Sequence, residues 1–182
     1  LEIENNFKKD CIKRKDYNSI LKWLDINDQS LLHKIHLKTS SREIFQDIEN
    51  ELSYIFKQLL NSKEYLLIGN KPSYLLGLSR DTRLVYDWHQ ECNYMKKISP
   101  IITAHFPLNT ECNTHNGAMS YLEGSNHLGK IKYQKQTNKN GYTNLRPIGM
   151  KELEKDYQIK QPLLEIGDCL FFNEFVIHKS NF

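Results

Sequence analysis

The 182-residue chain lacks the features that mark several large classes of protein. No stretch approaches the roughly 18 consecutive apolar residues that cross a bilayer, so we expect no membrane span. Its four cysteines are scattered without a C-x-x-C pair, which argues against a zinc ribbon and against a dense disulfide scaffold. The net charge is only +3 and no segment interleaves aromatic with basic residues, so we expect no nucleic-acid partner.

What the chain does contain is typical of one globular domain. Hydrophobic residues make up 39% of the chain, which is enough to form a core, and charged residues make up 26%. This composition is typical of a globular rather than a disordered chain. Unpaired cysteines, and the lack of a basic or apolar leader in residues 1–4, indicate a cytoplasmic protein. The chain starts without Met and stops at Phe182 inside an apolar run, so we expect further residues at both ends.

The periodicity of apolar residues predicts helices first and strands afterwards. Steps of three and four over 40–60 predict an amphipathic helix, and a shorter helix is expected over 17–24. Short apolar segments punctuated by Gly, Pro and Asn predict strands at 65–68, 73–78, 84–88, 101–107, 118–123, 163–165 and 169–178. The polar stretch 129–141 predicts a mobile loop. This order favours one domain, with a helical part over about 1–62 packed outside a β-core over about 63–182, a sandwich or jelly roll.

The strongest chemical signal is the tetrapeptide Trp88-His89-Gln90-Glu91. In an extended strand the side chains alternate, so His89 and Glu91 share one face while Gln90 points to the other. One imidazole and one carboxylate are two of the three ligands in the two-His-one-carboxylate triad that holds non-haem Fe(II). A polar pair at the end of a strand would explain the same residues without a metal.

Such a triad also needs a second histidine from a distant strand. His178 ends the apolar run 169–178 and is the only histidine near the C-terminus. A satisfied core histidine is the alternative interpretation of this position. His105 lies on another predicted strand, where it either supports the structure or faces the site.

Several motifs in this order resemble the phytanoyl-CoA dioxygenase family, a branch of the Fe(II)/2-oxoglutarate-dependent oxygenases, over about residues 83–182. The motifs are W-H-Q-E at 88–91, N-G-A-M-S-Y-L-E-G-S at 116–125, G-D-C-L-F-F at 167–172 and H-K-S at 178–180. The resemblance implies a double-stranded β-helix core (a jelly roll, cupin-like), with the N-terminal helices outside. It also implies an enzyme that uses Fe(II), 2-oxoglutarate and O2 to hydroxylate an unactivated C–H bond of a small molecule.

The resemblance further implies roles for individual positions. The iron ligands, which are also the catalytic residues, would be His89, Glu91 and His178. Ser180 would hydrogen-bond the far carboxylate of 2-oxoglutarate, and Tyr86 would line the co-substrate pocket. Asn116, with Gly117, would border that pocket, although a plain turn explains the pair equally well.

The chain departs from the family pattern at three places. Glu91 stands where Asp is commoner, which keeps the charge and the oxygen donor and argues against a halogenating relative. The hairpin motif lacks its proline and His127 is displaced by one position, which puts a role for that histidine in doubt. The family's arginine for 2-oxoglutarate is expected beyond Phe182, together with the last strand, and Arg146 is only a weak substitute.

The substrate is not identified by the sequence. Lys130, Lys132, Lys135 and Lys139 in the predicted loop would suit an anionic substrate group, and a solvated loop is the simpler explanation. Glycine at each end of 129–141 would suit a movable cover over the site. Two other functions remain: a cupin-like metal enzyme that does not use 2-oxoglutarate, and a catalytically silent β-domain.

Overall fold

The structure is a computed structural model. It describes residues 42–66, 86–95, 99–108, 111–114, 118–137 and 143–181, with parts of 20–34. Within these residues, no helix has both the length and the apolar character needed to cross a membrane.

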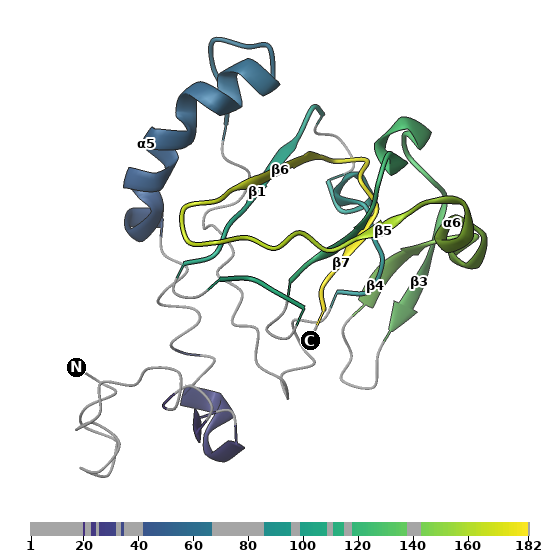
Figure 1. Ribbon diagram of the computed structural model, residues 1–182, viewed down its shortest axis with the longest axis horizontal. Coiled ribbons are helices and arrows are strands. Elements are labelled where there is room, and N and C mark those ends of the chain that lie inside the picture. The colour runs from purple at the N-terminus through teal and green to yellow at the C-terminus, as the bar shows by residue number, and fades with distance from the viewer. Residues whose placement is uncertain are drawn as a thin grey trace.

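The helix predicted over 40–60 is confirmed. Helix α5 spans Arg42–Leu59, and Figure 1 shows it to one side of the strands. The Phe56 ring makes an edge contact with Phe171, at 5.6 Å between ring centroids, so this residue of the apolar stripe of α5 packs on strand β6 (Leu170–Asn173). The described residues of the shorter predicted helix, Ile20, Trp23 and Leu24, are helical as well.

The strands form three small antiparallel sheets. Strand β1 (Ile102–His105) pairs with β6 (Leu170–Asn173). Strand β2 (Ser120–Leu122) lies between β5 (Ile159–Lys160) and β7 (His178–Lys179). Strands β3 (Tyr133–Thr137) and β4 (Thr143–Pro147) form the third sheet. The order of helix and strands agrees with the predicted helical part and β-core, and the complete double-stranded β-helix and the single domain stay predictions.

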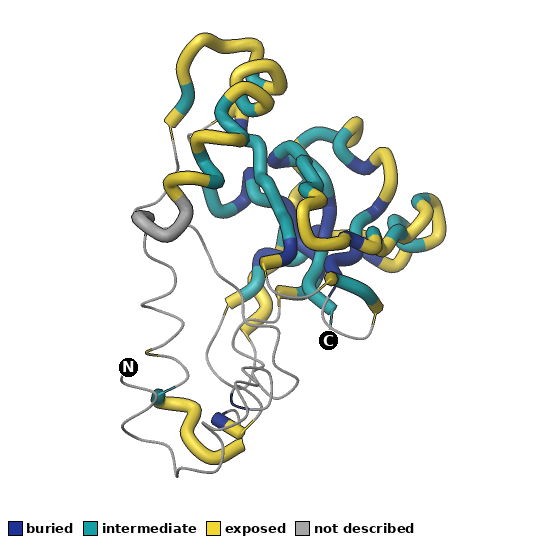
Figure 2. The backbone as a smooth tube through the Cα atoms, turned by 60° about the vertical axis from the view of Figure 1, so that its left-hand side comes forward, coloured by how far each residue is buried: buried dark blue, intermediate teal, exposed yellow. Residues whose placement is uncertain are grey.

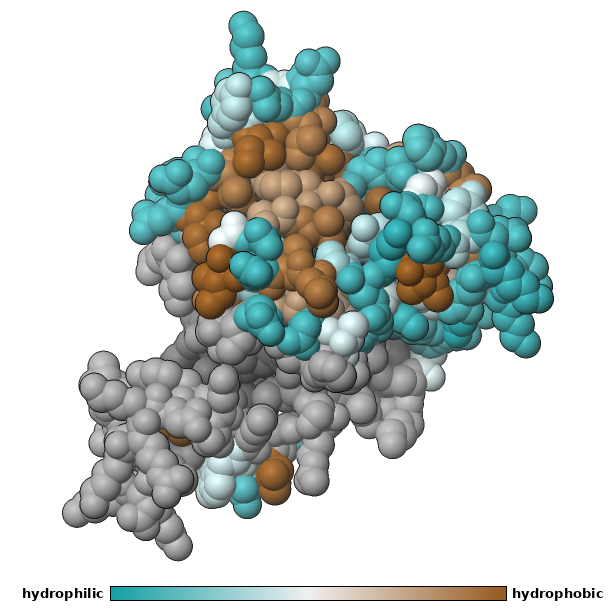
Figure 3. All heavy atoms as spheres, viewed as in Figure 1, coloured by the Kyte–Doolittle hydropathy of each residue, from teal (hydrophilic) through white to brown (hydrophobic). Residues whose placement is uncertain are grey.

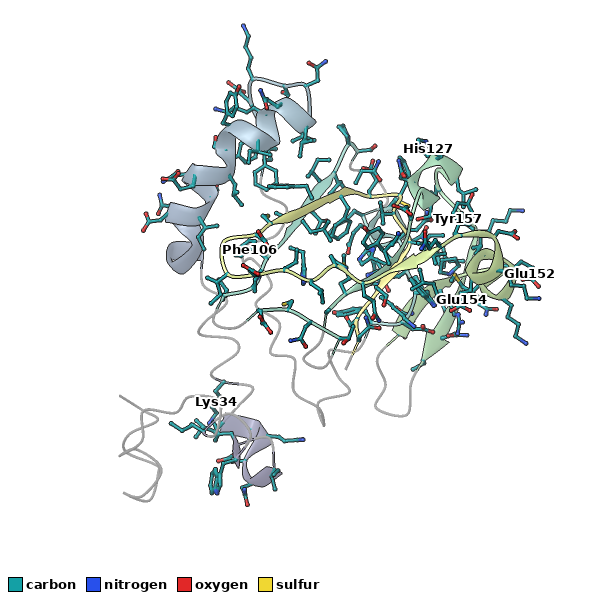
Figure 4. All side chains as sticks on the ribbon, viewed as in Figure 1. Lys34, Phe106, His127, Glu152, Glu154 and Tyr157 are labelled. Atoms are coloured by element: carbon teal, nitrogen blue, oxygen red, sulfur yellow. The ribbon has the colours of Figure 1, made fainter. Side chains whose placement is uncertain are left out.

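Short helical turns connect the strands. The 3-10 turn η2 spans Glu91–Asn93 and η3 spans Ser125–Leu128. Helix α6 spans Met150–Asp156 and was not predicted, although Met150, Leu153 and Tyr157 have helical spacing. Figure 4 shows Glu152 on the outer side of α6, with Glu154 and Tyr157 on the side of the strands.

The buried core of the β region lies between α6 and the sheet of β5, β2 and β7. Its centre is formed by Trp88, Leu122, Met150 and Ile177, all less than 5% exposed. The Trp88 indole N–H donates a hydrogen bond to Glu154 Oε1 at 2.7 Å. This bond gives the N–H group the partner that it needs in a buried ring. In Figure 2 the buried segments gather in the β region, whereas α5 is mostly exposed or half-buried.

Three predicted strands differ from the structure. The described residues of 65–68, Tyr65 and Leu66, are irregular, because the Tyr65 ring packs back on Phe56 of α5 at 5.4 Å. In 84–88, the residues from Tyr86 to Trp88 are not in a strand, since the Asp87 side chain accepts the Trp88 N–H in place of a strand partner. At 163–165 the pairing with other described residues is a single bridge between Leu164 and Cys112.

The segment predicted as one strand over 169–178 is two strands, β6 and β7, in different sheets. A turn at Glu174 separates them, and the buried Glu174 carboxylate accepts hydrogen bonds from Ser99 Oγ at 2.6 Å and Ile101 N at 3.0 Å. These contacts hold the turn against the start of β1, so the chain crosses from one sheet to the next.

The loop predicted over 129–141 is wrong over 133–137, whereas residues 129–132 are irregular as expected and the mobility stays a prediction. Residues 133–137 form β3, which pairs with β4 from Tyr133 opposite Pro147 to Thr137 opposite Thr143. The error has a physical reason: all of β3 after Tyr133 is exposed, so the strand carries none of the apolar alternation that marks a half-buried strand. The strand predicted at 73–78 lies outside the described residues, as does Lys139.

Candidate metal centre

Two predicted ligands are brought together by the backbone. His89 and His178 face each other in an isolated antiparallel bridge, in which His89 N donates to His178 O at 2.9 Å and His178 N donates to His89 O at 3.1 Å. Residues directly opposite in an antiparallel pair project their side chains to the same face. The two imidazole rings therefore lie 4.2 Å apart between centroids, although His178 is 89 positions after His89 along the chain.

Glu91 approaches the two histidines because the extended backbone at Gln90 gives way to a 3-10 turn at Glu91. An extended chain would place the Cα atoms of His89 and Glu91 roughly 6.6 Å apart, with parallel side chains. Instead Glu91 begins the 3-10 turn η2, which swings its carboxylate across the histidines. Glu91 Oε1 lies 3.6 Å from His89 Nε2 and 3.5 Å from His178 Nε2. The sequence led us to expect His89 and Glu91 on the same face, but it did not predict the turn η2 that brings Glu91 to both histidines.

The ring orientation of both histidines is set by backbone carbonyls. His89 Nδ1 lies 2.8 Å from Asp87 O, and His178 Nδ1 lies 3.0 Å from Val176 O. A carbonyl oxygen can only accept, so each Nδ1 must carry the proton. The lone pair of a neutral ring is then on Nε2, the atom that faces Glu91.

The surroundings favour an ionised Glu91 carboxylate and a neutral His178 ring. Burial by itself raises the pKa of Glu91, but the neighbouring side chains of His178 and His89 outweigh it, so the pKa of this carboxyl group lies well below its usual range. Burial lowers the pKa of His178. A carboxylate and neutral imidazoles are the forms that coordinate a divalent cation.

The three side chains fit a metal by their donor set. The candidate ligand atoms of His89, Glu91 and His178 all lie within 4.8 Å of one another. Both histidines are about 5% exposed, whereas the Glu91 side chain is 27% exposed. Two imidazole nitrogens and one carboxylate oxygen suit Fe(II) and leave coordination positions for other molecules. The arrangement can therefore hold a metal at the edge of the core while one side stays open.

Two of the predicted co-substrate residues lie beside this centre. The Tyr86 ring is 5.5 Å from the His89 ring and is 39% exposed. Ser180 is half-buried, and its N–H donates to Tyr86 O at 2.8 Å, so the two residues are neighbours. Asn116 lies outside the described residues.

The departures from the family pattern can also be located. Arg146 forms an ion pair with Asp87, 2.9 Å between Nη1 and Oδ2, so its guanidinium already has a carboxylate partner. His127 is exposed on η3. Among the described residues, the buried Nε2 atom of His105 has no hydrogen-bond partner, and burial, followed by the charge of His178, lowers the pKa of this ring.

A cavity of about 320 Å³ lies between β2 and β6, and none of the three candidate ligands lines it. Phe172 lines it and also packs on His178, with 4.7 Å between the ring centroids. The other lining residues are Met119, Tyr121, Leu122, Gly124, Asn126, Leu170, Phe171, Asn173 and Val176. No charged side chain is among them, so this cavity suits an uncharged, largely apolar group.

Three supporting residues were missed by the sequence analysis: Gln90, Ser125 and Glu174. Each is polar and at most 2% exposed. Ser125 Oγ donates to Leu122 O at 2.7 Å and accepts from Ile177 N at 2.9 Å, directly before His178. The sequence did contain a signal for Gln90. The strand alternation that puts His89 and Glu91 on one face directs the Gln90 amide into the core, where a polar group needs hydrogen-bond partners.

The comparison with protein families agrees with this geometry. The family model described as Phytanoyl-CoA dioxygenase (PhyH) matches residues 12–181, nearly the whole chain. No curated protein matches the chain.

Proposed function

Because the chain belongs to the phytanoyl-CoA dioxygenase family, we propose that it is an Fe(II)- and 2-oxoglutarate-dependent dioxygenase acting in the cytoplasm. Its reaction would hydroxylate an unactivated C–H bond of a small-molecule metabolite. The observation that carries the proposal is the convergence of His89, Glu91 and His178 on one face, with both Nε2 atoms turned toward the carboxylate.

The metal would be held by His89 Nε2, His178 Nε2 and a Glu91 carboxylate oxygen. Fe(II) bound there would supply the activation of O2 that is coupled to oxidative decarboxylation of 2-oxoglutarate. In the overall reaction, R–H, O2 and 2-oxoglutarate give R–OH, succinate and CO2. One oxygen atom enters the product alcohol and the other enters succinate, so atoms and electrons balance.

The chain's own residues orient the ligands and limit access of water. The carbonyls of Asp87 and Val176 fix the two rings, which keeps the Nε2 lone pairs aimed at one point. Burial of both histidines keeps water from the inner side of the centre. For the co-substrate, we propose that Tyr86 and Ser180 contact 2-oxoglutarate from the open side, together with Asn116.

For the substrate, the cavity beside Phe172 favours an apolar part next to the reacting carbon. Figure 3 shows apolar side chains gathered on the face between α5 and β5, with hydrophilic ones over α6 and the β3–β4 side. Lys130, Lys132 and Lys135 are exposed on or just before β3. This exposure argues against a role in binding an anionic substrate group. An anionic substrate group stays the alternative, and turnover insensitive to salt would exclude it.

Anaerobic titration with Fe(II) tests the metal centre. We expect one Fe(II) per chain, and loss of binding in His89→Ala and in Glu91→Ala, because each removes one of three ligands. His127→Ala is the matched control, since this histidine is exposed on η3. A wild-type protein that binds no Fe(II) would leave the silent β-domain as the better description.

Product analysis separates the remaining alternatives. With Fe(II), ascorbate and O2, we expect succinate to form only when 2-oxoglutarate is added. A metal-bound protein that never produces succinate would instead be a cupin-like enzyme of another type. A mass-spectrometric screen of candidate metabolites for a gain of about 16 mass units, one oxygen atom, then identifies the substrate.

A further inference from the structure

We propose that Gln90, the residue between two of the ligands, is a positioning residue of the metal centre. Its side chain is completely buried and lies on the core side of the chain, opposite His89 and Glu91. The inference rests on the proposed function, because it takes these two residues and His178 as metal ligands.

The Gln90 amide is fully engaged with the backbone of two distant loops. Nε2 donates to Phe175 O at 2.7 Å and to Gly129 O at 2.9 Å. Oε1 accepts from Ile131 N at 3.0 Å. Both N–H groups and the carbonyl of the side chain are therefore used, and no other residue type of this length offers two donors and one acceptor in this geometry.

These contacts place Gln90 between the parts that carry the ligands. Phe175 is in the turn between β6 and β7, three residues before His178, so one hydrogen bond ties the two ligand-bearing segments together. Gln90 is also where the chain changes from extended backbone, φ −123° and ψ 138°, to the 3-10 turn that begins at Glu91. Holding this residue therefore fixes where the extended backbone gives way to the turn, and with it the approach of the Glu91 carboxylate.

The test is metal affinity in two variants that keep the length of the side chain. Gln90→Met removes all three hydrogen bonds, and Gln90→Glu keeps an acceptor for Ile131 but has no donor for Gly129 O or Phe175 O. Ser120→Ala is the control, since Ser120 Oγ also accepts buried hydrogen bonds, from Gln161 and Asn181, but on strand β2. Binding of Co(II) is followed anaerobically through its visible absorption, on protein shown to be folded by circular dichroism.

We expect both Gln90 variants to bind Co(II) roughly 10- to 100-fold more weakly than wild type, with an altered absorption spectrum, while Ser120→Ala stays within about twofold. A loss smaller than fivefold in the Gln90 variants overturns the inference, and so does an equal loss in Ser120→Ala. A wild-type protein that binds no Co(II) overturns the proposed function itself, which distinguishes the two failures.

A measurement on wild type covers the case in which the variants do not fold. Hydrogen exchange of the Ile131 N–H reports on its bond to Gln90 Oε1. If Gln90 transmits the geometry of the centre, Zn(II) binding slows this exchange at least fivefold. Exchange at Ile131 that is unchanged by bound metal overturns the inference.

Discussion

Replacing Ser125 by alanine should destabilise the protein far more than the loss of one hydroxyl suggests. Ser125 is fully buried, and its Oγ joins β2 to the segment before β7. In the variant the Ile177 N–H and the Leu122 carbonyl each lose a partner inside the core, where water cannot replace it. Ile177 and Leu122 are themselves fully buried, so both groups carry the desolvation cost.

The magnitude follows from these two groups. An orphaned buried N–H costs about 1–3 kcal/mol, and a weakened carbonyl adds about 1 kcal/mol, so the free energy of unfolding should fall by about 2–4 kcal/mol. For a chain of this size that lowers the melting temperature by roughly 5–15 °C. Because Ile177 precedes His178, the variant should also bind metal more weakly.

Urea unfolding followed by circular dichroism measures the change, with Thr143→Val as the matched control. Thr143 loses a hydroxyl that contacts Thr137 Oγ1 at 3.0 Å, but on the exposed face of the β3–β4 sheet. Its free energy of unfolding should stay within about 0.5 kcal/mol of wild type. If Ser125→Ala were no less stable than this control, the reasoning about buried backbone groups would be refuted.

Three further predictions concern the surroundings of the centre. Gly129→Ala should lower the free energy of unfolding, measured in urea, by about 1–3 kcal/mol. The cause is backbone strain alone, because φ is +61° at this position while open space surrounds the new methyl group. An unchanged urea midpoint would contradict this. Met150→Ala should lower the free energy of unfolding by about 2–5 kcal/mol in the same assay, because the Met150 side chain is buried in one cluster with Trp88. Arg146→Gln should cost less than about 1 kcal/mol, and the difference should shrink in 1 M salt, because the pair with Asp87 is partly exposed.

Local patterns in the sequence predicted the elements that have one buried face. The spacing of apolar residues predicted α5 within two residues at each end, since a helix that docks one stripe must repeat at 3.6 residues. The period of two placed His89 and Glu91 on one face and Gln90 on the other. The same reasoning failed for β3, where every residue after Tyr133 is exposed and no alternation of apolar residues marks the strand.

Contacts between distant segments were beyond such patterns. The partners of the buried Gln90 amide are Gly129, Ile131 and Phe175, which lie 39 to 85 positions away. The split of 169–178 into two strands depends on Ser99 and Ile101 binding the Glu174 carboxylate. Nothing in the local sequence of either segment encodes these partners.

The sequence by itself therefore determined which side chains could serve as ligands, because residue chemistry and strand alternation are local properties. Only the tertiary structure decided that His178 lies opposite His89, and that Glu91 reaches both rings. It also decided which nitrogen of each ring faces the centre, through the carbonyls of Asp87 and Val176. The reason is physical: coordination depends on distances of a few ångströms between atoms whose approach is set by the path of the whole chain.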